Sequence, residues 1–114
     1  MNLDEICHEL GLTVRTPTAA LDKTVTGGYA SDLLSCVMGA AKEGNVWVTL
    51  QAHPNVVAVA SLLSLAGVII TEGVEPDEVT LQKAEQQSIA ILTTDATTFT
   101  VVGKLYTLGV PGVE

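Results

Sequence analysis

The stretch VWVTLQAHPNVVAVASLLSLAGVIIT, residues 46–71, contains two short apolar runs separated by a longer apolar segment. The runs at 46–50 and 67–71 have the length and composition of buried β-strands. Residues 54–66 are long enough for a helix and place Pro54 in its first turn, where proline is favourable. Strand, helix and strand in this order are typical of a βαβ unit with two parallel strands.

The same alternation continues on both sides of this stretch. We predict further helices over 3–10, 29–41, 76–87 and 95–109, and further strands over 12–16, 24–26 and 88–94. Residues 17–23 are predicted to form a loop. The pattern indicates one α/β domain over residues 1–114, with a short, mostly parallel sheet covered by helices on both faces.

Composition and charge limit the classes of function. The chain has 114 residues, 47% of them hydrophobic, and carries a net charge of −8 from 13 acids and 5 bases. The five bases are scattered, which argues against binding to nucleic acid or to an acidic membrane surface. The longest apolar run, 56–70, is too short to span a membrane. The acidic N-terminus lacks the basic region of a signal peptide, so we expect a cytoplasmic protein.

No catalytic or metal-binding pattern is present in the sequence. The two cysteines, Cys7 and Cys36, have neither metal-ligand spacing nor the arrangement of a disulfide framework. His53 is the histidine nearest a predicted loop, but no serine and acid complete a catalytic set around it. We therefore predict no metal, no cofactor and no enzymatic activity.

The helix predicted over 54–66 is apolar on nearly every side. A helix of this kind is buried on every side, and a small chain with one sheet has little else to cover it. We expect a second subunit to do so in a two-fold dimer. The candidate interface residues are Val56, Val59, Leu62 and Leu63. The alternative is burial under the chain's own termini.

The glycine pair in VTGGYASDLLS, residues 25–35, raises the question of a phosphate-binding loop. A Walker loop requires a lysine and a hydroxyl residue after its last glycine. Here no lysine follows, and the carboxylate of Asp32 would repel phosphate. We predict that Gly27 and Gly28 form a tight turn between a strand and a helix, with a weak anion site as the alternative.

A ligand of a parallel sheet binds outside the carboxyl ends of the strands. The loops expected there supply neutral polar groups, and the helices behind them supply backbone N–H groups suited to an anion. Capping of those helices is the alternative role for the same side chains. The candidate ligand-binding residues are Gly27, Gly28, Gln51, His53, Asn55, Thr93, Thr94, Thr97 and Thr98.

Over nearly its whole length the sequence resembles the DRTGG domain family. The resemblance rests on Gly28-Tyr29 with Ser31 to Ser35, on Trp47-Val48-Thr49, on Asn55 with Ala58-Val59-Ala60, and on Phe99 with Lys104-Leu105-Tyr106. Thr26-Gly27-Gly28 match the end of the name-giving motif. Thr24-Val25 stand where the family has an Asp-Arg pair, which puts any anion binding by that basic residue in doubt.

The resemblance implies a small α/β domain similar to the N-terminal domain of HPr kinase/phosphorylase. Family members accompany CBS domains, some pyrophosphatases and some phosphate acetyltransferases, as accessory, dimer-forming or regulatory parts. No catalytic residues are implied. A label of HPr kinase is rejected for this chain because the P-loop of such a kinase is missing.

These observations together predict a non-catalytic regulatory domain that forms a homodimer. We expect it to sense a small anionic metabolite or nucleotide at the carboxyl ends of its strands. The alternative is a protein-docking or dimerisation module that binds no small ligand.

Overall fold

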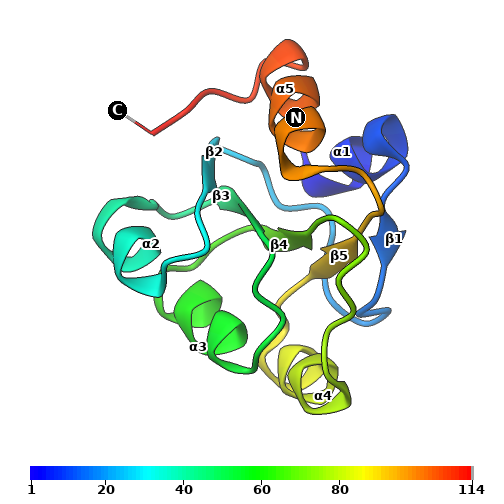
Figure 1. Cartoon of the computed structure of the whole chain (residues 1–114), viewed down its shortest axis with the longest axis vertical. Helices are drawn as coiled ribbons and strands as arrows, with labels where there is room; N and C mark the ends of the chain where they lie inside the picture. Colours follow the sequence, from blue (N-terminus) through cyan, green and yellow to red (C-terminus); the bar gives the residue numbers. More distant parts are fainter. Residues whose placement is uncertain (114) are drawn as a thin grey trace.

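The computed structural model describes residues 1–113, which form five helices around one five-stranded sheet. The strands lie in the order β1-β5-β4-β3-β2 (Figure 1). Strands β2 to β5 are parallel, and β1 pairs antiparallel with β5. The elements are α1 (Leu3–Leu10), β1 (Thr13–Val14), β2 (Gly27–Ala30), α2 (Leu34–Ala40), β3 (Asn45–Thr49), α3 (Asn55–Leu62), β4 (Gly67–Ile70), α4 (Glu78–Gln87), β5 (Ile91–Thr93) and α5 (Thr98–Thr107).

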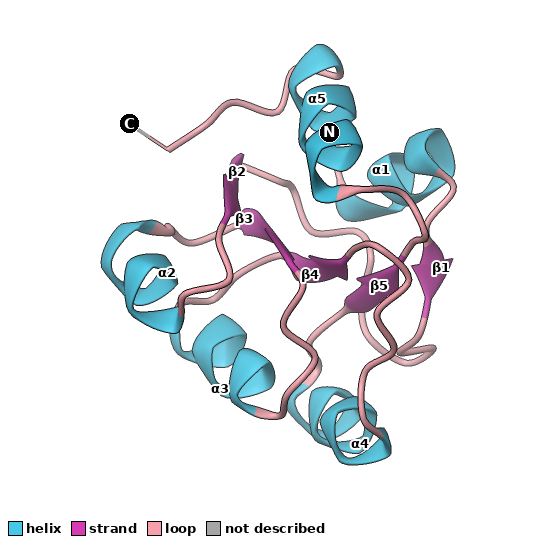
Figure 2. Ribbon diagram, viewed as in Figure 1, coloured by secondary structure: helices cyan, strands magenta, loops and turns pink. Residues whose placement is uncertain are grey.

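The order of the parallel strands determines where the helices lie. Strands β2, β3, β4 and β5 are neighbours in chain order, so each crossover steps in the same direction across the sheet. Because such crossovers are all right-handed, crossovers that step in one direction place their helices on the same face of the sheet. Helices α2, α3 and α4 indeed share one side, and α1 and α5 cover the other (Figure 2). The prediction of a mostly parallel sheet with helices on both faces is confirmed.

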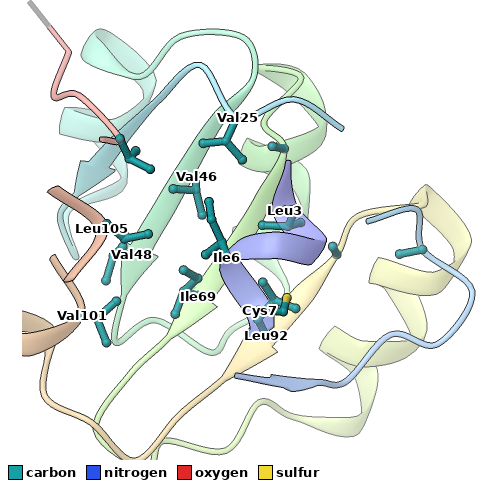
Figure 3. Packing of buried hydrophobic residues seen from close by; sticks show 14 residues of the cluster. Leu3, Ile6, Cys7, Val25, Val46, Val48, Ile69, Leu92, Val101 and Leu105 are labelled. Carbon is teal, nitrogen blue, oxygen red and sulfur yellow. The ribbon is translucent and has the colours of Figure 1, made fainter. Parts of the chain in front are cut away.

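The sheet separates two apolar cores because alternate side chains of each strand point to opposite faces. In β3, Val46 and Val48 pack towards α1 and α5, whereas Trp47 packs towards α2, α3 and α4. Leu3 and Ile6 of α1 lie over the strands on the first side, together with α5 (Figure 3). Both faces of the central strands are therefore excluded from water.

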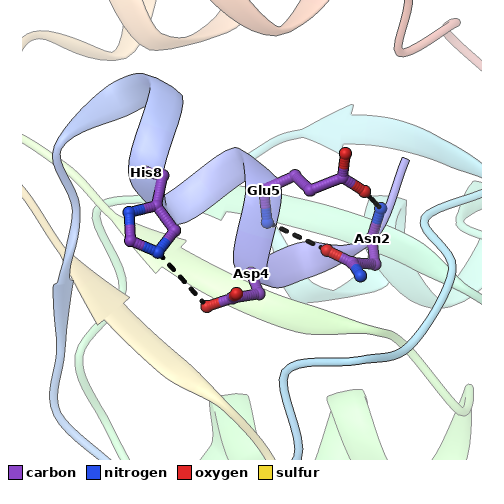
Figure 4. A network of polar contacts seen from close by, with 4 residues as sticks. All are labelled: Asn2, Asp4, Glu5 and His8. Carbon is purple, nitrogen blue, oxygen red and sulfur yellow. Dashed lines mark hydrogen bonds and ion pairs between the residues drawn. The ribbon is translucent and has the colours of Figure 1, made fainter.

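Helix α1 begins with a complete capping box. The Asn2 side chain accepts a hydrogen bond from the Glu5 backbone N–H at 2.9 Å, and the Glu5 carboxylate accepts one from the Asn2 backbone N–H at 3.0 Å (Figure 4). This exchange satisfies two N–H groups at the open end of the helix. Asn2 is therefore the N-cap residue of α1.

The prediction for the glycine pair was wrong in its placement. Gly27 and Gly28 are the first two residues of β2, and the strand-to-helix turn lies later, at 31–33. Backbone pairing of Gly27 to Ala30 with β3 keeps these residues extended. The local apolar periodicity favoured a helix from residue 29. Hydrogen-bonded pairing with β3 outweighs that preference, so α2 begins only at Leu34.

Two other helices are shorter than predicted. Helix α3 ends at Leu62, and Ser64 follows in the left-handed region with φ +56°. Helix α5 begins at Thr98 instead of residue 95, with the Thr97 side chain accepting a hydrogen bond from the Thr100 N–H. Thr97 is therefore the N-cap residue of α5. No helix within residues 1–113 is long and apolar enough to cross a membrane.

The apolar residues of α3 are divided between the chain's own core and its surface. Val56 and Val59 are buried against the sheet and neighbouring helices, and Leu63 packs partly against the same core. Leu62 is 69% exposed. Because the chain itself covers Val56 and Val59, Leu62 is the residue of the four that offers most surface to a second subunit.

We predict that the two cysteines differ strongly in reactivity. Burial raises the pKa of the Cys7 thiol, and the nearby Asp4 carboxylate raises it further, whereas Cys36 is exposed on α2. The reactive form of cysteine is the thiolate. Titration of the folded protein with a chromogenic disulfide at pH 8 should show one fast thiol per chain and a second only after unfolding. A C36S variant should lose the fast phase, and fast reaction of both thiols would contradict the packing of α1.

Candidate functional site

The loops that follow β4 and β5 leave the sheet in opposite directions. The loop after β4 leads to α4 on one face, and the loop after β5 leads to α5 on the other (Figure 1). Such a divergence at the carboxyl ends of neighbouring parallel strands opens the crevice in which α/β proteins bind ligands. The topology thus identifies the carboxyl ends of β4 and β5 as the candidate site.

A polar cleft of about 380 Å³ lies at this place. The antiparallel strand β1 borders it, because Thr13 pairs with Thr93 at the carboxyl end of β5. The cleft is lined by Gly11, Thr13, Arg15, Gly73, Val74, Glu75, Thr93, Thr94, Asp95 and Ala96. Its volume suits a small molecule.

Arg15 is the sole cationic side chain in the lining of this cleft as formed by residues 1–113. It directly follows β1, and its backbone N–H donates to the Ile91 carbonyl at 2.9 Å, which anchors it to the sheet. Its Nη1 lies 2.8 Å from Oε2 of Glu75. The cleft therefore contains a guanidinium, the group best suited to bind a phosphate or carboxylate.

The two loops that form the cleft are tied together. The backbone N–H groups of Glu72 and Gly73 donate to the carbonyls of Ala96 and Thr94, at 2.9 and 3.0 Å. Glu72 and Gly73 both have left-handed backbones, with φ +61° and +72°. The Glu72 carboxylate also accepts a hydrogen bond from the Thr98 N–H at the start of α5. This carboxylate already occupies the anion-attracting end of α5.

The predicted site residues do not all meet. Thr93 and Thr94 line the cleft. Thr97 caps α5, and the Thr98 hydroxyl lies 2.6 Å from that of Thr71. Gly27 and Gly28, at the start of β2, lie at the opposite end of the sheet from the strands' carboxyl ends.

The predicted site residues after β3 form hydrogen bonds that hold their own loop in place. The Gln51 amide donates to the Asp32 carbonyl at 2.8 Å, and the His53 Nδ1 accepts a hydrogen bond from the Asn55 N–H at 3.3 Å. The carboxylate of Asp32 accepts from the Thr49 hydroxyl and the Leu50 N–H. The His53 contact lies at the start of α3, whereas Gln51 and Asp32 join the loop after β3 to the loop after β2. No three His, Cys, Asp or Glu side chains within residues 1–113 are grouped to hold a metal ion.

An apolar hollow of about 80 Å³ lies between α5 and the edge strand β2. It is lined by Gly28, Tyr29, Ala30, Val48, Val102, Leu105, Tyr106, Val110, Pro111 and Gly112. Tyr106, which lines this hollow, is 75% exposed, and Phe99 at the start of the same helix is 90% exposed. Exposed aromatic residues beside an apolar hollow are typical of surfaces that bind another macromolecule.

Comparison with models of protein families matches residues 19–108 to the DRTGG domain. The chain belongs to the DRTGG domain family. The match begins after β1, so α1, β1 and Arg15 lie outside the matched residues although they pack against the same sheet. A search of curated proteins found no match to this DRTGG chain.

A solved structure shares the fold of this DRTGG domain. It contains the CBS and DRTGG domains of the regulatory region of Clostridium perfringens pyrophosphatase, complexed with the activator diadenosine tetraphosphate. The TM-score is 0.68 at 17% sequence identity, and the match covers 90% of this chain. Our chain spans 45% of that longer chain. In that pyrophosphatase the DRTGG domain is part of a regulatory region.

The matching part of the family's name-giving motif has a structural explanation here. The Thr26 hydroxyl donates to the Glu43 carbonyl at 2.8 Å and accepts from the Asn45 amide at 3.1 Å. A Cβ on Gly27 would lie 3.1 Å from the Pro111 carbonyl oxygen. Thr26 thus joins the start of β2 to the turn before β3. The missing side chain of Gly27 leaves room for the backbone at Pro111.

Sequence reasoning missed Arg15, Gly73 and Glu75. Arg15 and Glu75 are 60 positions apart, and their meeting depends on the antiparallel addition of β1 to the sheet edge. The sequence placed Arg15 inside the strand predicted over 12–16, but nothing in it showed which strand this one would pair with.

We predict that G44A destabilises the domain. Gly44 has φ +81°, and a Cβ there would lie 2.7 Å from the Thr26 Cγ2. Strain and overpacking together should lower the free energy of unfolding by about 2–4 kcal/mol. G39A is the matched control: Gly39 lies in α2 with open space around it, so alanine should be neutral or stabilising by up to about 1 kcal/mol. Urea denaturation measures both, and equal stability of the two variants would contradict this account of the Thr26 network.

Proposed function

We propose that this DRTGG chain is a non-catalytic regulatory domain that binds a small anionic ligand, such as a nucleotide or another phosphate-bearing metabolite. The observation that carries the proposal is Arg15, whose guanidinium lines a polar cleft at the carboxyl ends of β4 and β5. The threonines around it, Thr13, Thr93 and Thr94, supply hydroxyl groups for the same ligand. The structural neighbour supports the ligand class, since its regulatory region is complexed with a nucleotide activator.

The absence of catalysis is part of this proposal. His53 uses its Nδ1 to accept a backbone N–H at the start of α3, which is a structural task. The stretch after Gly28 lacks the lysine of a Walker loop, which argues against the kinase activity of HPr kinase. Binding of an anion requires only a cationic group in a cleft, and Arg15 supplies this group in the polar cleft.

Residues 1–114 are proposed to act as one unit located in the cytoplasm. Helix α1 precedes the family match, but Leu3 and Ile6 pack in the same core as the matched residues Val46 and Ile69. The thiols of Cys7 and Cys36 are free, as is usual in a reducing compartment.

A second copy of this chain is the proposed partner. Residues 33–41 and 44–71, which include α2 and α3, contain no Asp, Glu, Lys or Arg, although the chain carries a net charge of −8. Leu33, Met38 and Leu62 are exposed on these two adjacent helices. Two acidic subunits meet with least repulsion across an uncharged surface. Charge and exposure together support a two-fold contact along α2 and α3.

Protein docking without a small ligand is the second candidate function. It is favoured by the exposed Phe99 and Tyr106 on α5, which lie on the other side of the sheet from α2 and α3. Helix α5 contains Lys104 and no acidic residue. An acidic or apolar segment of a partner protein would suit this face.

We expect anionic ligands to raise the thermal unfolding midpoint through Arg15. A ligand at 100 times its dissociation constant adds about 2.7 kcal/mol to stability, or about 10 °C for a domain of this size. The measurement is a thermal scan with millimolar nucleotides, acyl phosphates and phosphosugars. R15Q should abolish any selective shift, whereas K42Q, which removes a charge away from the cleft, should retain it. A panel without shifts would leave docking as the favoured function.

Dimerisation should depend on Leu62. Light scattering at micromolar concentration should give the mass of a dimer for the natural chain and of a monomer for L62E. The control is V79E, which adds the same charge at an exposed site on the polar helix α4 and should remain dimeric. A monomer mass for the natural chain would contradict the proposed homodimer, and dissociation by F99E alone would move the interface to α5.

A further inference from the structure

The two side chains of the Arg15–Glu75 ion pair differ in solvent exposure and in how firmly they are anchored. The Arg15 side chain is 25% exposed and is anchored through its backbone to β5, whereas the Glu75 side chain is 71% exposed on the loop after β4. The guanidinium is therefore held in the wall of the cleft, and the carboxylate reaches it from the solvent side. Exposed ion pairs of this kind contribute little to stability because water screens them.

The backbone around Glu75 is restrained independently of this ion pair. Hydrogen bonds from the N–H groups of Glu72, Gly73 and Val74 hold the preceding loop, and Pro76 after it is buried. Rotation of the Glu75 side chain breaks its contact with Arg15 without breaking any of these bonds. The carboxylate can therefore leave the guanidinium while the loop keeps its shape.

A carboxylate and a phosphate use the same N–H donors of a guanidinium. In the observed arrangement Glu75 occupies the donor Nη1 of Arg15. An incoming anion that takes this donor replaces Glu75 there, and any anion must approach past the exposed carboxylates of Glu75 and Asp95 in the same cleft. The charge of Glu75 thus opposes binding twice, by occupying a donor and by repelling the ligand.

We propose that Glu75 is a built-in competitor for the anion site at Arg15, so that its carboxylate sets the ligand concentration at which the cleft fills. This inference rests on the proposed function, because it requires that an anion binds at Arg15. The ligand class that it selects is one with a doubly charged, multidentate group, such as a phosphate monoester or a terminal nucleotide phosphate. A group of that class offers the guanidinium more negative charge than the single carboxylate it replaces.

The test is calorimetric titration of the full chain with inorganic phosphate, and separately with ATP, at fixed low ionic strength. E75Q keeps the size of the side chain and removes its charge, so it should bind each probe about three- to tenfold more tightly than the natural chain. The matched control is E43Q, which makes the same change of net charge at an exposed acid outside the cleft. It should leave the affinity unchanged, and R15Q should bind neither probe.

The outcomes separate the two proposals. Equal affinities of E75Q and the natural chain, with binding lost in R15Q, would overturn the role of Glu75 and leave the anion site standing. Equal gains in E75Q and E43Q would show a general effect of net charge and also overturn that role. Binding of neither probe to the natural chain or to E75Q would overturn the inference together with the proposed site.

Discussion

The central strands of this domain are apolar on both faces, and covering both faces is the constraint on which the rest of the fold depends. In β3 and β4 every residue is buried. The three crossovers between β2 and β5 place α2, α3 and α4 on one face only. The other face must be covered by segments outside these crossovers, and α1 and α5 do so. Apolar burial at about 25 cal/mol per Å² is the dominant stabilising contribution of such packing.

The candidate site follows from that division of the helices. Because α5 crosses to the face opposite α4, the loops after β4 and β5 lead to opposite faces, and the cleft lies between these loops and the segment around β1. The N-terminal segment that brings α1 to its place also adds β1 to the sheet edge, and Arg15 follows β1 into the cleft wall. Arg15, the cation in the cleft lining as formed by residues 1–113, thus comes from a segment outside the residues that match the DRTGG family. The proposed binding of an anion there would therefore depend on this chain's own N-terminal segment.

Charged side chains are distributed unevenly over the molecule, so its helices present surfaces of different chemical character. Helices α1 and α4 carry acidic side chains to solvent, whereas α2 and α3 carry no charged residue. Helix α5 combines a buried face at Val101 and Leu105 with exposed aromatic residues. The acidic side chains of residues 1–113 thus lie on α1, α4 and the loops, and the uncharged helices carry the proposed contact with a second subunit.

The sequence by itself determined the alternation of strands and helices and the parallel sheet, because these depend on apolar runs of characteristic length within short windows. The family resemblance rested instead on particular residues, such as Trp47 and Asn55. The sequence also indicated the polar residues after the strands, of which Thr93 and Thr94 line the cleft. Only the tertiary structure decided that Gly27 and Gly28 begin a strand, since pairing with β3 outweighs local periodicity. The meeting of Arg15 with Glu75 was likewise decided there. Which strand lies beside β1 depends on packing across the whole sheet, and no local pattern encodes it.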